Sequence, residues 1–294
     1  KVFHQTYGSV LFPAIEVSSP ASYRSIYNRA QPQKADARTY EENNGECLKE
    51  LERAFELAGA GKVAALVLEP RVQGAAGFLM HPHGYLQQAA AIAQKYGAKL
   101  ILDEVMTGFG RTGKDFAFQH EEVQPDVIAL AKGITSGTLP LAATLCREEL
   151  FQGFSGDLSK TFYHGHSYNG NPLGCAAAIA SFQELQTDTC RKAREEMARA
   201  LGEVGQIFWQ HRHVGDVRQE GCILAIELVE ERKSRKAFPY EKRLGAAICL
   251  HAAQHGLLTR PVGDVLVLMP PYSTTPEEIH VMGDILFQAT QDTL

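Results

Sequence analysis

Three features are missing from the sequence, and each absence excludes a class of protein. The 294 residues include six cysteines but no Cys-x-x-Cys pair, so neither a zinc site nor a redox motif is indicated. No apolar run reaches the ~18 residues that a membrane-spanning helix needs. No Lys/Arg cluster suggests nucleic-acid binding, and the net charge is −5. We therefore expect no metal ion, no membrane and no nucleic acid among its partners.

Composition and charge indicate the compartment and the domain plan. The scattered cysteines lie mostly in apolar contexts, which indicates buried free thiols and a reducing, cytoplasmic compartment. Hydrophobic residues make up 45% of the chain, enough for a large core. Charge density rises sharply at residues 191–196. We expect a large α/β domain over residues 1–186 and a small C-terminal α+β domain over residues 187–294.

The first residues give a further expectation about the chain. Residues 1–4 (K-V-F-H) are neither an initiator methionine nor a secretory leader, and they read as sequence from within a domain. We expect an N-terminally incomplete version of a longer enzyme. Residues 1–43 are expected to be irregular, with a surface excursion over residues 28–44.

The order of apolar runs predicts a mostly parallel sheet flanked by helices, joined by right-handed crossovers. A capping box with proline at the first helical position, at residues 275–278, announces a final helix. Strands are expected at residues 64–68, 100–103, 127–130, 141–146 and 223–229, with extended segments at 257–258 and 265–269. Other helices are expected at residues 46–57, 84–96 and 172–186, from there to about 212, and at 240–254.

Two ionisable residues follow neighbouring strands of this sheet. Asp103 follows one short apolar run and Lys132 follows the next. Because the carboxyl ends of parallel strands meet at one edge, we expect a carboxylate and a primary amine there. Pyridoxal 5'-phosphate (PLP) needs both, since its aldehyde condenses with a lysine and its ring nitrogen stays protonated beside an anion. On spacing alone, a solvated loop lysine and a helix-capping aspartate are the commoner explanation.

Longer motifs around these residues resemble the class III aminotransferases, which are PLP enzymes of fold type I. The resemblance rests on L-D-E-V at residues 102–105, T-G-F-G-R-T-G at 107–113, P-D at 125–126 and A-K-G at 131–133. It extends over nearly the whole chain. It implies a fold type I α/β domain, PLP as cofactor, and an amino donor and a keto acceptor as substrates.

The resemblance gives three residues of the sheet edge a role. Asp103 would hold the proton of the cofactor's ring nitrogen, and Lys132 would bind its aldehyde and then move a proton at the substrate carbon. Val105, two residues further along the expected strand, would share the face of Asp103 and pack on the ring. Lys132 and Asp103 are thus the predicted catalytic residues.

Four more residues are predicted from the resemblance. Ser167 and the backbone of His166 would bind the phosphate of the partner subunit's cofactor, which implies a homodimer with shared active sites. Gly165 and Arg260 would bind substrate, and the Arg260 guanidinium would donate two hydrogen bonds to a substrate carboxylate. Without the resemblance, Arg260 reads as a solvated residue at a strand edge.

Other motifs compete with this interpretation. Residues 108–113 match the dinucleotide pattern G-x-G-x-x-G, but no helical periodicity follows them, and the next strand ends in Lys132 rather than an acidic residue. Residues 165–169 nearly match G-x-S-x-G, but Asn169 replaces the closing glycine. Closely spaced histidine pairs lack further ligands at metal-binding spacing. The roles of Glu69 and Arg111 stay open.

Within the family, three motifs look most like the adenosylmethionine–8-amino-7-oxononanoate aminotransferases of biotin synthesis. They are H-G-H-S-Y-N-G-N-P-L at residues 164–173, T-R-P at 259–261 and L-M-P-P at 268–271. The ketone substrate of that branch carries a distal carboxylate, which suits Arg260. Members that use adenosylmethionine often have Pro-Thr in place of His166-Ser167 and Tyr in place of Val267, and some with His-Ser use lysine. The donor therefore stays open between these two amines.

Two alternatives remain open from the sequence. One is an ω-amino-acid:pyruvate transaminase of the same class. The other is a catalytically silent truncated remnant, because a Gly-Ser phosphate loop and an aromatic residue that the family places near its N-terminus are not visible here.

Overall fold

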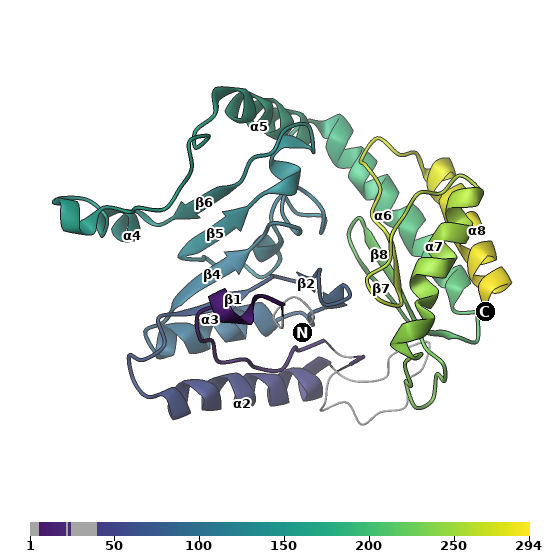
Figure 1. Ribbon diagram of the computed structural model, residues 1–294, viewed down its shortest axis with the longest axis horizontal. Helices are drawn as coiled ribbons and strands as arrows, with labels where there is room; N and C mark the ends of the chain where they lie inside the picture. Colours follow the sequence, from purple (N-terminus) through teal and green to yellow (C-terminus); the bar gives the residue numbers. More distant parts are fainter. Residues whose placement is uncertain (1–5, 22, 25–39) are drawn as a thin grey trace.

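The computed structural model describes residues 6–21, 23–24 and 40–294 of the chain. In Figure 1, a four-stranded sheet with its helices lies on one side, and a three-stranded sheet backed by three helices lies on the other. Helix α5 (Pro172–Leu185) ends and α6 (Asp188–Phe208) begins at the junction, close to the expected boundary at residue 186. The two-domain division itself stays a prediction. Residues 1–4 and most of the expected excursion at 28–44 lie outside the described residues.

The first sheet has the strand order β1–β4–β5–β6, parallel except at β6. Short apolar runs form its strands, as the sequence predicts. The expectation of fully buried strands was wrong, because β4 alternates buried and half-buried residues and Val67 of β1 is 58% exposed, so one face of the sheet is only partly covered. The predicted strand at 141–146 is confirmed, but it runs antiparallel to its neighbour. The four strands are β1 (Ala65–Leu68), β4 (Lys99–Asp103), β5 (Val127–Leu130) and β6 (Ala143–Cys146).

Two helices cover one face of this sheet, and their apolar sides form its core. Helix α2 (Tyr40–Ala58) buries Leu48, Leu51 and Phe55, the residues whose spacing predicts it. It begins earlier than expected, so residues 40–44 are helical and not irregular. Helix α3 (Tyr85–Lys95) makes the crossover between β1 and β4 and packs on α2.

The second sheet is antiparallel, with the order β7–β8–β9, and its helices cover one face. Strand β8 is buried at all six positions and is the centre of this core. The capping box at Thr275 and Glu278 is confirmed at the start of α8. The elements are β7 (Val214–Glu220), β8 (Ile223–Leu228), β9 (Val265–Leu268), α6, α7 (Leu244–Gln254) and α8 (Pro276–Thr293).

The remaining elements are short. Strand β7 was not expected from the sequence, whereas residues 257–258 form no strand. None of the helices among the described residues is both long enough and apolar enough to cross a bilayer. The short elements are β2 (Val72–Gln73), β3 (Leu79–Met80), α4 (Glu148–Gln152), η1 (Gly8–Val10), η2 (Ala117–His120), η3 (Lys132–Thr135), η4 (Leu158–Lys160) and η5 (Tyr240–Lys242).

The two sheets are joined through a seam that combines apolar and ionic contacts. Val72 and Phe78 pack against the face of the second sheet that α6–α8 do not cover. We call the first sheet with its helices the first unit, and the second sheet with its helices the second unit. Arg71 is buried and forms ion pairs with Glu121 of the first unit, at 3.2 Å, and with Glu220 of β7 in the second unit, at 2.6 Å. Arg218 donates to the carbonyls of Gly77 and Phe78. Buried charges that are paired in this way fix one relative placement of the two sheets.

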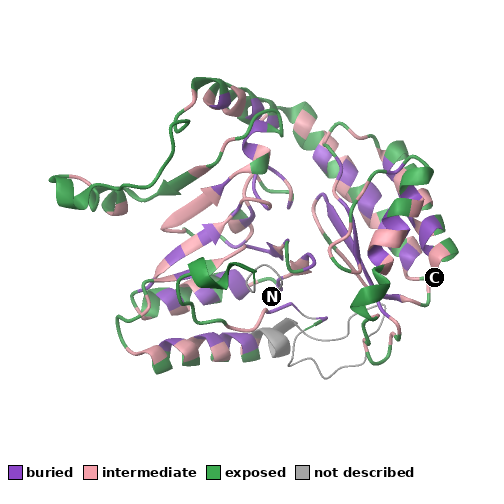
Figure 2. Ribbon diagram, viewed as in Figure 1, coloured by how far each residue is buried: buried purple, intermediate pink, exposed green. Residues whose placement is uncertain are grey.

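One segment stands apart from both cores. Residues 153–171, here called the arm, leave the body of the molecule beside α4 and return at the start of α5 (Figure 1). All residues of the arm except Ser155 and Asn171 are exposed, as the green colour in Figure 2 shows. Its large exposed apolar side chains are Phe154, Leu158, Phe162, Tyr163 and Tyr168.

All six cysteines are free thiols, as expected, but only half of them are buried. The core accommodates Cys47, Cys222 and Cys249. Cys146 is exposed on β6, where the expectation of burial was wrong, because β6 is an edge strand with three exposed residues.

Candidate active site

Asp103 and Lys132 lie at the same edge of the first sheet. Asp103 is the last residue of β4, and its Cα pairs with that of Ala129 on the adjoining parallel strand β5. Lys132 follows three residues later, just beyond the end of β5. Neighbouring parallel strands therefore bring the carboxylate and the amine to one edge, as the sequence predicts.

The expected position of Val105 within the strand was wrong. Strand β4 ends at Asp103 because the Asp103 carboxylate accepts a hydrogen bond of 3.0 Å from the Val105 N–H and folds the chain into a turn. Val105 thus lies beside Asp103 through this turn and not through strand alternation. The same bond leaves the second carboxylate oxygen of Asp103 without a hydrogen-bond donor among the described residues.

Glu69 belongs to the same edge. It follows β1, and its carboxylate accepts a hydrogen bond of 2.9 Å from the Gly74 N–H. Burial raises the pKa of Glu69, and the nearby charges of Asp103 and Lys132 act on it in opposite directions. Three adjoining strands therefore contribute two carboxyl groups and one amine to a single electrostatic neighbourhood.

Glu104 supports this edge from inside, a role that the sequence did not reveal. It is fully buried and accepts hydrogen bonds from the Thr107 hydroxyl at 2.7 Å and from the Ala117 and Phe118 N–H groups, both at 2.9 Å. Burial raises the pKa of Glu104, although these three bonds oppose the shift. It ties residues 105–118 back to the end of β4 and so fixes the loop that follows Asp103.

Lys132 has an uncommon backbone conformation. Its φ of +47° lies in the left-handed region, which non-glycine residues rarely adopt. Its ammonium is exposed and makes no hydrogen bond or ion pair with any described residue. Strain of this kind persists only where the surroundings impose it, and it concentrates at functional sites.

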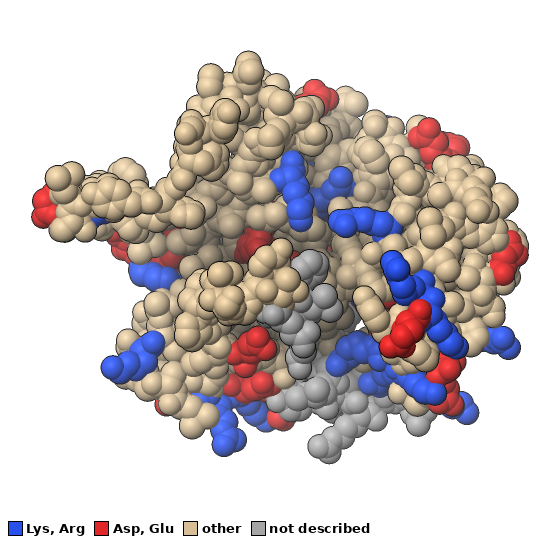
Figure 3. All heavy atoms as spheres, in the orientation of Figure 1, with Lys and Arg blue, Asp and Glu red and all other residues tan. Residues whose placement is uncertain are grey.

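A cleft of ≈ 860 Å³ opens beside Lys132, which forms part of its wall. Arg111 and Tyr272 also form its wall, and the Arg111 guanidinium lies 4.5 Å from the centre of the Tyr272 ring. Arg111 donates to the Pro270 carbonyl at 2.7 Å, which gives it a structural role between the two units. Figure 3 shows Lys and Arg side chains gathered in the middle of the face that is turned towards the viewer, between the two halves of the molecule.

The three predicted residues of the arm lie outside this neighbourhood. Gly165, His166 and Ser167 are exposed, and none of them forms part of the wall of the cleft. The His166 ring accepts a hydrogen bond of 3.1 Å from the Tyr168 N–H. The Asn171 side chain accepts from the first N–H groups of α5, so the start of that helix is already capped.

Arg260 is also separate from the cleft. It is exposed, has no hydrogen-bond or ionic partner among the described residues, and does not contribute to the wall that contains Lys132. It lies on the segment that leads into β9, where Val262 and Val265 form an isolated bridge. The chain therefore brings together Asp103, Val105 and Lys132, and leaves Arg260 and the arm residues outside.

The competing motifs find little support in their surroundings. Residues 108–113 are followed by turns and the short 3-10 helix η2, and not by the α-helix that a dinucleotide site needs. Among the described residues, no group of three or more His, Cys, Asp and Glu side chains could hold a metal ion.

The chain was then compared with known proteins. The family model described as "Aminotransferase class-III" matches residues 12–290. This chain belongs to the class III aminotransferase family. The match includes both Asp103 and Lys132, and it extends across both units of the fold. The α/β architecture is therefore that of the fold type I PLP-dependent transferases, as the sequence predicts.

Similar proteins include enzymes named for one reaction. An adenosylmethionine-8-amino-7-oxononanoate aminotransferase of Geobacter sulfurreducens is 42% identical over 96% of this chain and 61% of its own length. The crystal structure of the protein of that name from Methanocaldococcus jannaschii has a TM-score of 0.86 at 33% identity, covering 99% of this chain and 63% of the other. An (S)-enantioselective omega-transaminase from Thermomicrobium roseum has a TM-score of 0.87 at 32% identity, over 98% and 63%. The chain thus spans a little over three fifths of the length of these relatives.

Proposed function

We propose that this chain is a PLP-dependent aminotransferase that converts 8-amino-7-oxononanoate into 7,8-diaminononanoate, a step of biotin synthesis. The observation that carries the proposal is the pairing of Asp103 and Lys132 on adjoining strands of a class III chain. Relatives that bear the name of this reaction are 34–47% identical to the chain, which supports the choice of substrate.

The donor set of the sheet edge fits PLP. An exposed amine without an ionic partner suits an aldehyde, and a carboxylate with one unoccupied oxygen suits a protonated ring nitrogen. Val105, held beside Asp103 by the turn, would contact the ring. When bound, PLP supplies an aldehyde carbon that exchanges amines and a cationic ring that withdraws electrons from the substrate.

The chain's own residues would then bind and move protons. Lys132 Nζ would hold the aldehyde carbon, and as a free amine it would take a proton from the donor's carbon and give one to the acceptor's carbon. Asp103 would keep the ring nitrogen protonated. The backbone conformation of Lys132 would set the direction in which its side chain leaves the chain.

Arg260 would bind the carboxylate of the keto acceptor. Its guanidinium has no partner among the described residues, so its donors are available to an anion. Replacement of Arg260 by leucine should raise KM for 8-amino-7-oxononanoate roughly 10- to 100-fold, since about 1.4–3 kcal/mol is typical for a charge-assisted bond. The half-reaction with the donor should change little if the donor does not use this residue.

We further propose a homodimer in which the arm of one chain completes the site of the other. The arm exposes five large apolar side chains, and the mostly apolar helix α5 exposes Leu173, Ile179 and Phe182. His166 and Ser167 lie on this arm, outside their own chain's cleft, which supports a role for them in a second copy. Free thiols at all six cysteines support a reducing, cytoplasmic location.

Turnover with defined substrates tests the proposal. The full chain is incubated with PLP, 8-amino-7-oxononanoate and either adenosylmethionine or lysine, and 7,8-diaminononanoate is measured by mass spectrometry. Product with one of these donors, absent for Lys132→Ala and retained for the exposed Lys62→Ala, is the expected result. Turnover of ω-amino acids with pyruvate alone would favour the related transaminase activity. A chain that turns over none of these substrates and develops no colour when PLP is added would instead be a silent remnant.

A further inference from the structure

The turn formed by Phe109 and Gly110 lies between Lys132 and the second unit of the fold. It follows β4 within the loop that Glu104 anchors, and both residues are buried. Phe109 has a φ of +60°, so this turn, like Lys132, adopts a backbone conformation that its surroundings must impose.

One side of this turn contacts the backbone next to Lys132. A Cβ added at Gly133 would lie 3.0 Å from the Cβ of Phe109 and 3.2 Å from its ring, so the Phe109 side chain packs directly on the Gly133 backbone. Gly133 follows Lys132 in η3, whose hydrogen bonds include Ile134 N–H to the Ala131 carbonyl at 3.1 Å. Phe109 therefore limits the positions that the strained Lys132 backbone can take.

The other side is held by two residues from beyond the junction at residue 186. The Tyr272 hydroxyl donates a hydrogen bond of 2.9 Å to the Phe109 carbonyl, and burial raises the pKa of Tyr272, so the hydroxyl stays a donor. Arg194 of α6 lies against Gly110 so closely that a Cβ there would overlap its guanidinium. Only glycine leaves room for this contact, and its φ of +94° also favours glycine.

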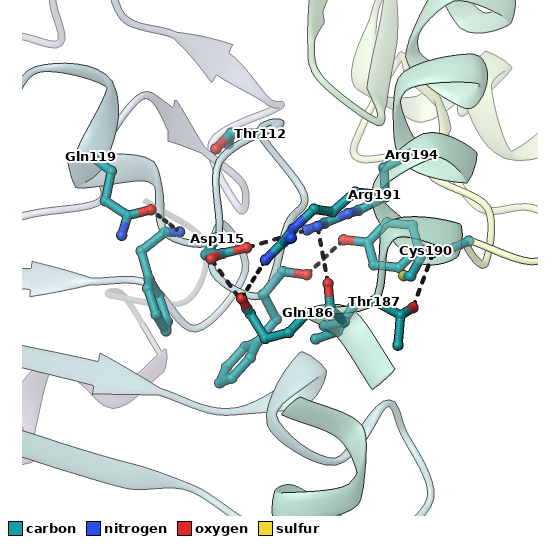
Figure 4. A network of polar contacts seen from close by, with 12 residues as sticks. Thr112, Asp115, Gln119, Gln186, Thr187, Cys190, Arg191 and Arg194 are labelled. Atoms are coloured by element: carbon teal, nitrogen blue, oxygen red, sulfur yellow. Dashed lines mark hydrogen bonds and ion pairs between the residues drawn. The ribbon is translucent and has the colours of Figure 1, made fainter. Parts of the chain in front are cut away.

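Arg194 is itself fixed in a polar network, which Figure 4 shows from close by. It is buried, donates to the Leu185 carbonyl at 3.2 Å, and lies 3.7 Å from the Asp115 carboxylate. Gln186 donates to the other Asp115 oxygen at 3.1 Å. The network thus joins the start of α6 to the loop that contains the Phe109–Gly110 turn.

We propose that Tyr272 and Arg194 are positioning residues for Lys132, acting through the Phe109–Gly110 turn. Neither residue makes a hydrogen bond or an ion pair with Lys132, although Tyr272 lines the same cleft, and their effect passes from the second unit to the Gly133 backbone. The placement of the second unit is thereby coupled to the geometry of the amine. The catalytic meaning of this coupling rests on the proposed role of Lys132, but the coupling itself can be measured without it.

Amide hydrogen exchange at residues 131–137, the segment that contains Lys132, tests this proposal. In the full chain, Tyr272→Phe removes only the hydroxyl that holds the Phe109 carbonyl. Loss of one hydrogen bond should speed exchange of the amides at residues 131–137 about three- to tenfold. Tyr96→Phe is the matched control, because its hydroxyl contacts Glu56 on the far side of the first sheet at 3.5 Å. Peptides from β8 report global stability.

A second variant protects the test against a folding defect at Tyr272. Arg194→Lys keeps the charge near Asp115 but removes the fork that packs on Gly110, and it should also speed exchange at residues 131–137 with β8 unchanged. In parallel, the rate at which PLP and borohydride label Lys132 should fall in both variants. Exchange at 131–137 that stays at the wild-type rate, or that rises equally in β8, would overturn the proposal. Failure of the wild-type chain to be labelled would instead count against the proposed function.

Discussion

The edge of the first sheet and the arm carry the two parts of the proposed site, and they are built in opposite ways. At the sheet edge, Asp103 and Lys132 are fixed by strand register, by buried Glu104 and by close packing at Gly133. In the arm, His166 and Ser167 lie on an exposed segment whose apolar side chains contact solvent. This difference is what the proposed homodimer requires: one chain positions the amine and the carboxylate, and the arm of a second copy would complete the phosphate site.

The largest expected effect concerns the sheet edge. Asp103→Asn should lower turnover roughly 10²–10³-fold, because a neutral amide cannot stabilise the proton on the ring nitrogen. The fold should be retained, since Asn can still accept the bond from the Val105 N–H. Steady-state kinetics of the PLP-saturated protein measure this. Asp126→Asn, at the opposite end of β5, is the control and should change turnover no more than a few-fold; equal losses in both variants would contradict the assignment.

The next effect concerns the arm as an interface. Leu158 is 80% exposed in one chain, so Leu158→Asp should change the free energy of unfolding of a lone chain by less than about 0.5 kcal/mol. At a dimer interface the same change should weaken association roughly 30-fold or more. Sedimentation equilibrium of the wild-type chain and of Leu158→Asp measures the dimer dissociation constant of each. Leu57→Asp, 78% exposed on α2, is the control, and an unchanged dimer constant for Leu158→Asp would remove the arm from the interface.

A mixture of two inactive chains sharpens the same comparison. Lys132→Ala lacks the amine, and Ser167→Glu places a negative charge where a phosphate would bind. In a mixed dimer, one of the two sites would combine an intact Lys132 with an intact Ser167 from the other chain. Refolding equal amounts together should restore about a quarter of wild-type activity, the share expected for random pairing. Activity no higher than the average of the separate variants would show that each site belongs to one chain.

The sequence predicted the sheet edge well because local signals were strong there. Short apolar runs ending at Asp103 and Lys132 gave both strands, and the family motifs gave the chemistry. Strand β7 was missed because its Asp216 and Arg218 look like surface residues, yet Arg218 pairs with both Asp216 and Glu227 inside the seam. The role of Tyr272 depends on a contact with Phe109, 163 positions away, which no local pattern reports.

A further expected effect concerns stability away from the site. His81 is buried, and neither ring nitrogen has a hydrogen-bond partner among the described residues. Burial, and then the Arg71 charge, lower the pKa of His81 to about 3 from its ordinary value of 6.5. Below pH 6.5 the unfolded chain therefore binds a proton at His81 that the folded chain does not bind. The free energy of unfolding falls by about 1.4 kcal/mol for each pH unit between pH 6.5 and pH 3.

Urea unfolding at pH 7 and pH 5 checks this expectation. His81→Phe keeps the edge-on ring contact with Tyr85 and should flatten the loss of stability on the acid side. The exposed His255→Phe is the control and should retain the wild-type slope. A slope that is the same in all three proteins would contradict the account of His81.

The central claim is that Lys132 is the residue that binds the cofactor's aldehyde, next to the carboxylate of Asp103. Reduction of the PLP-treated chain with borohydride, followed by peptide mapping, tests it most directly. The account predicts a pyridoxyl group on the peptide that contains Lys132, with its yield reduced in Asp103→Asn. A chain left unlabelled, or labelled at another lysine, would contradict it.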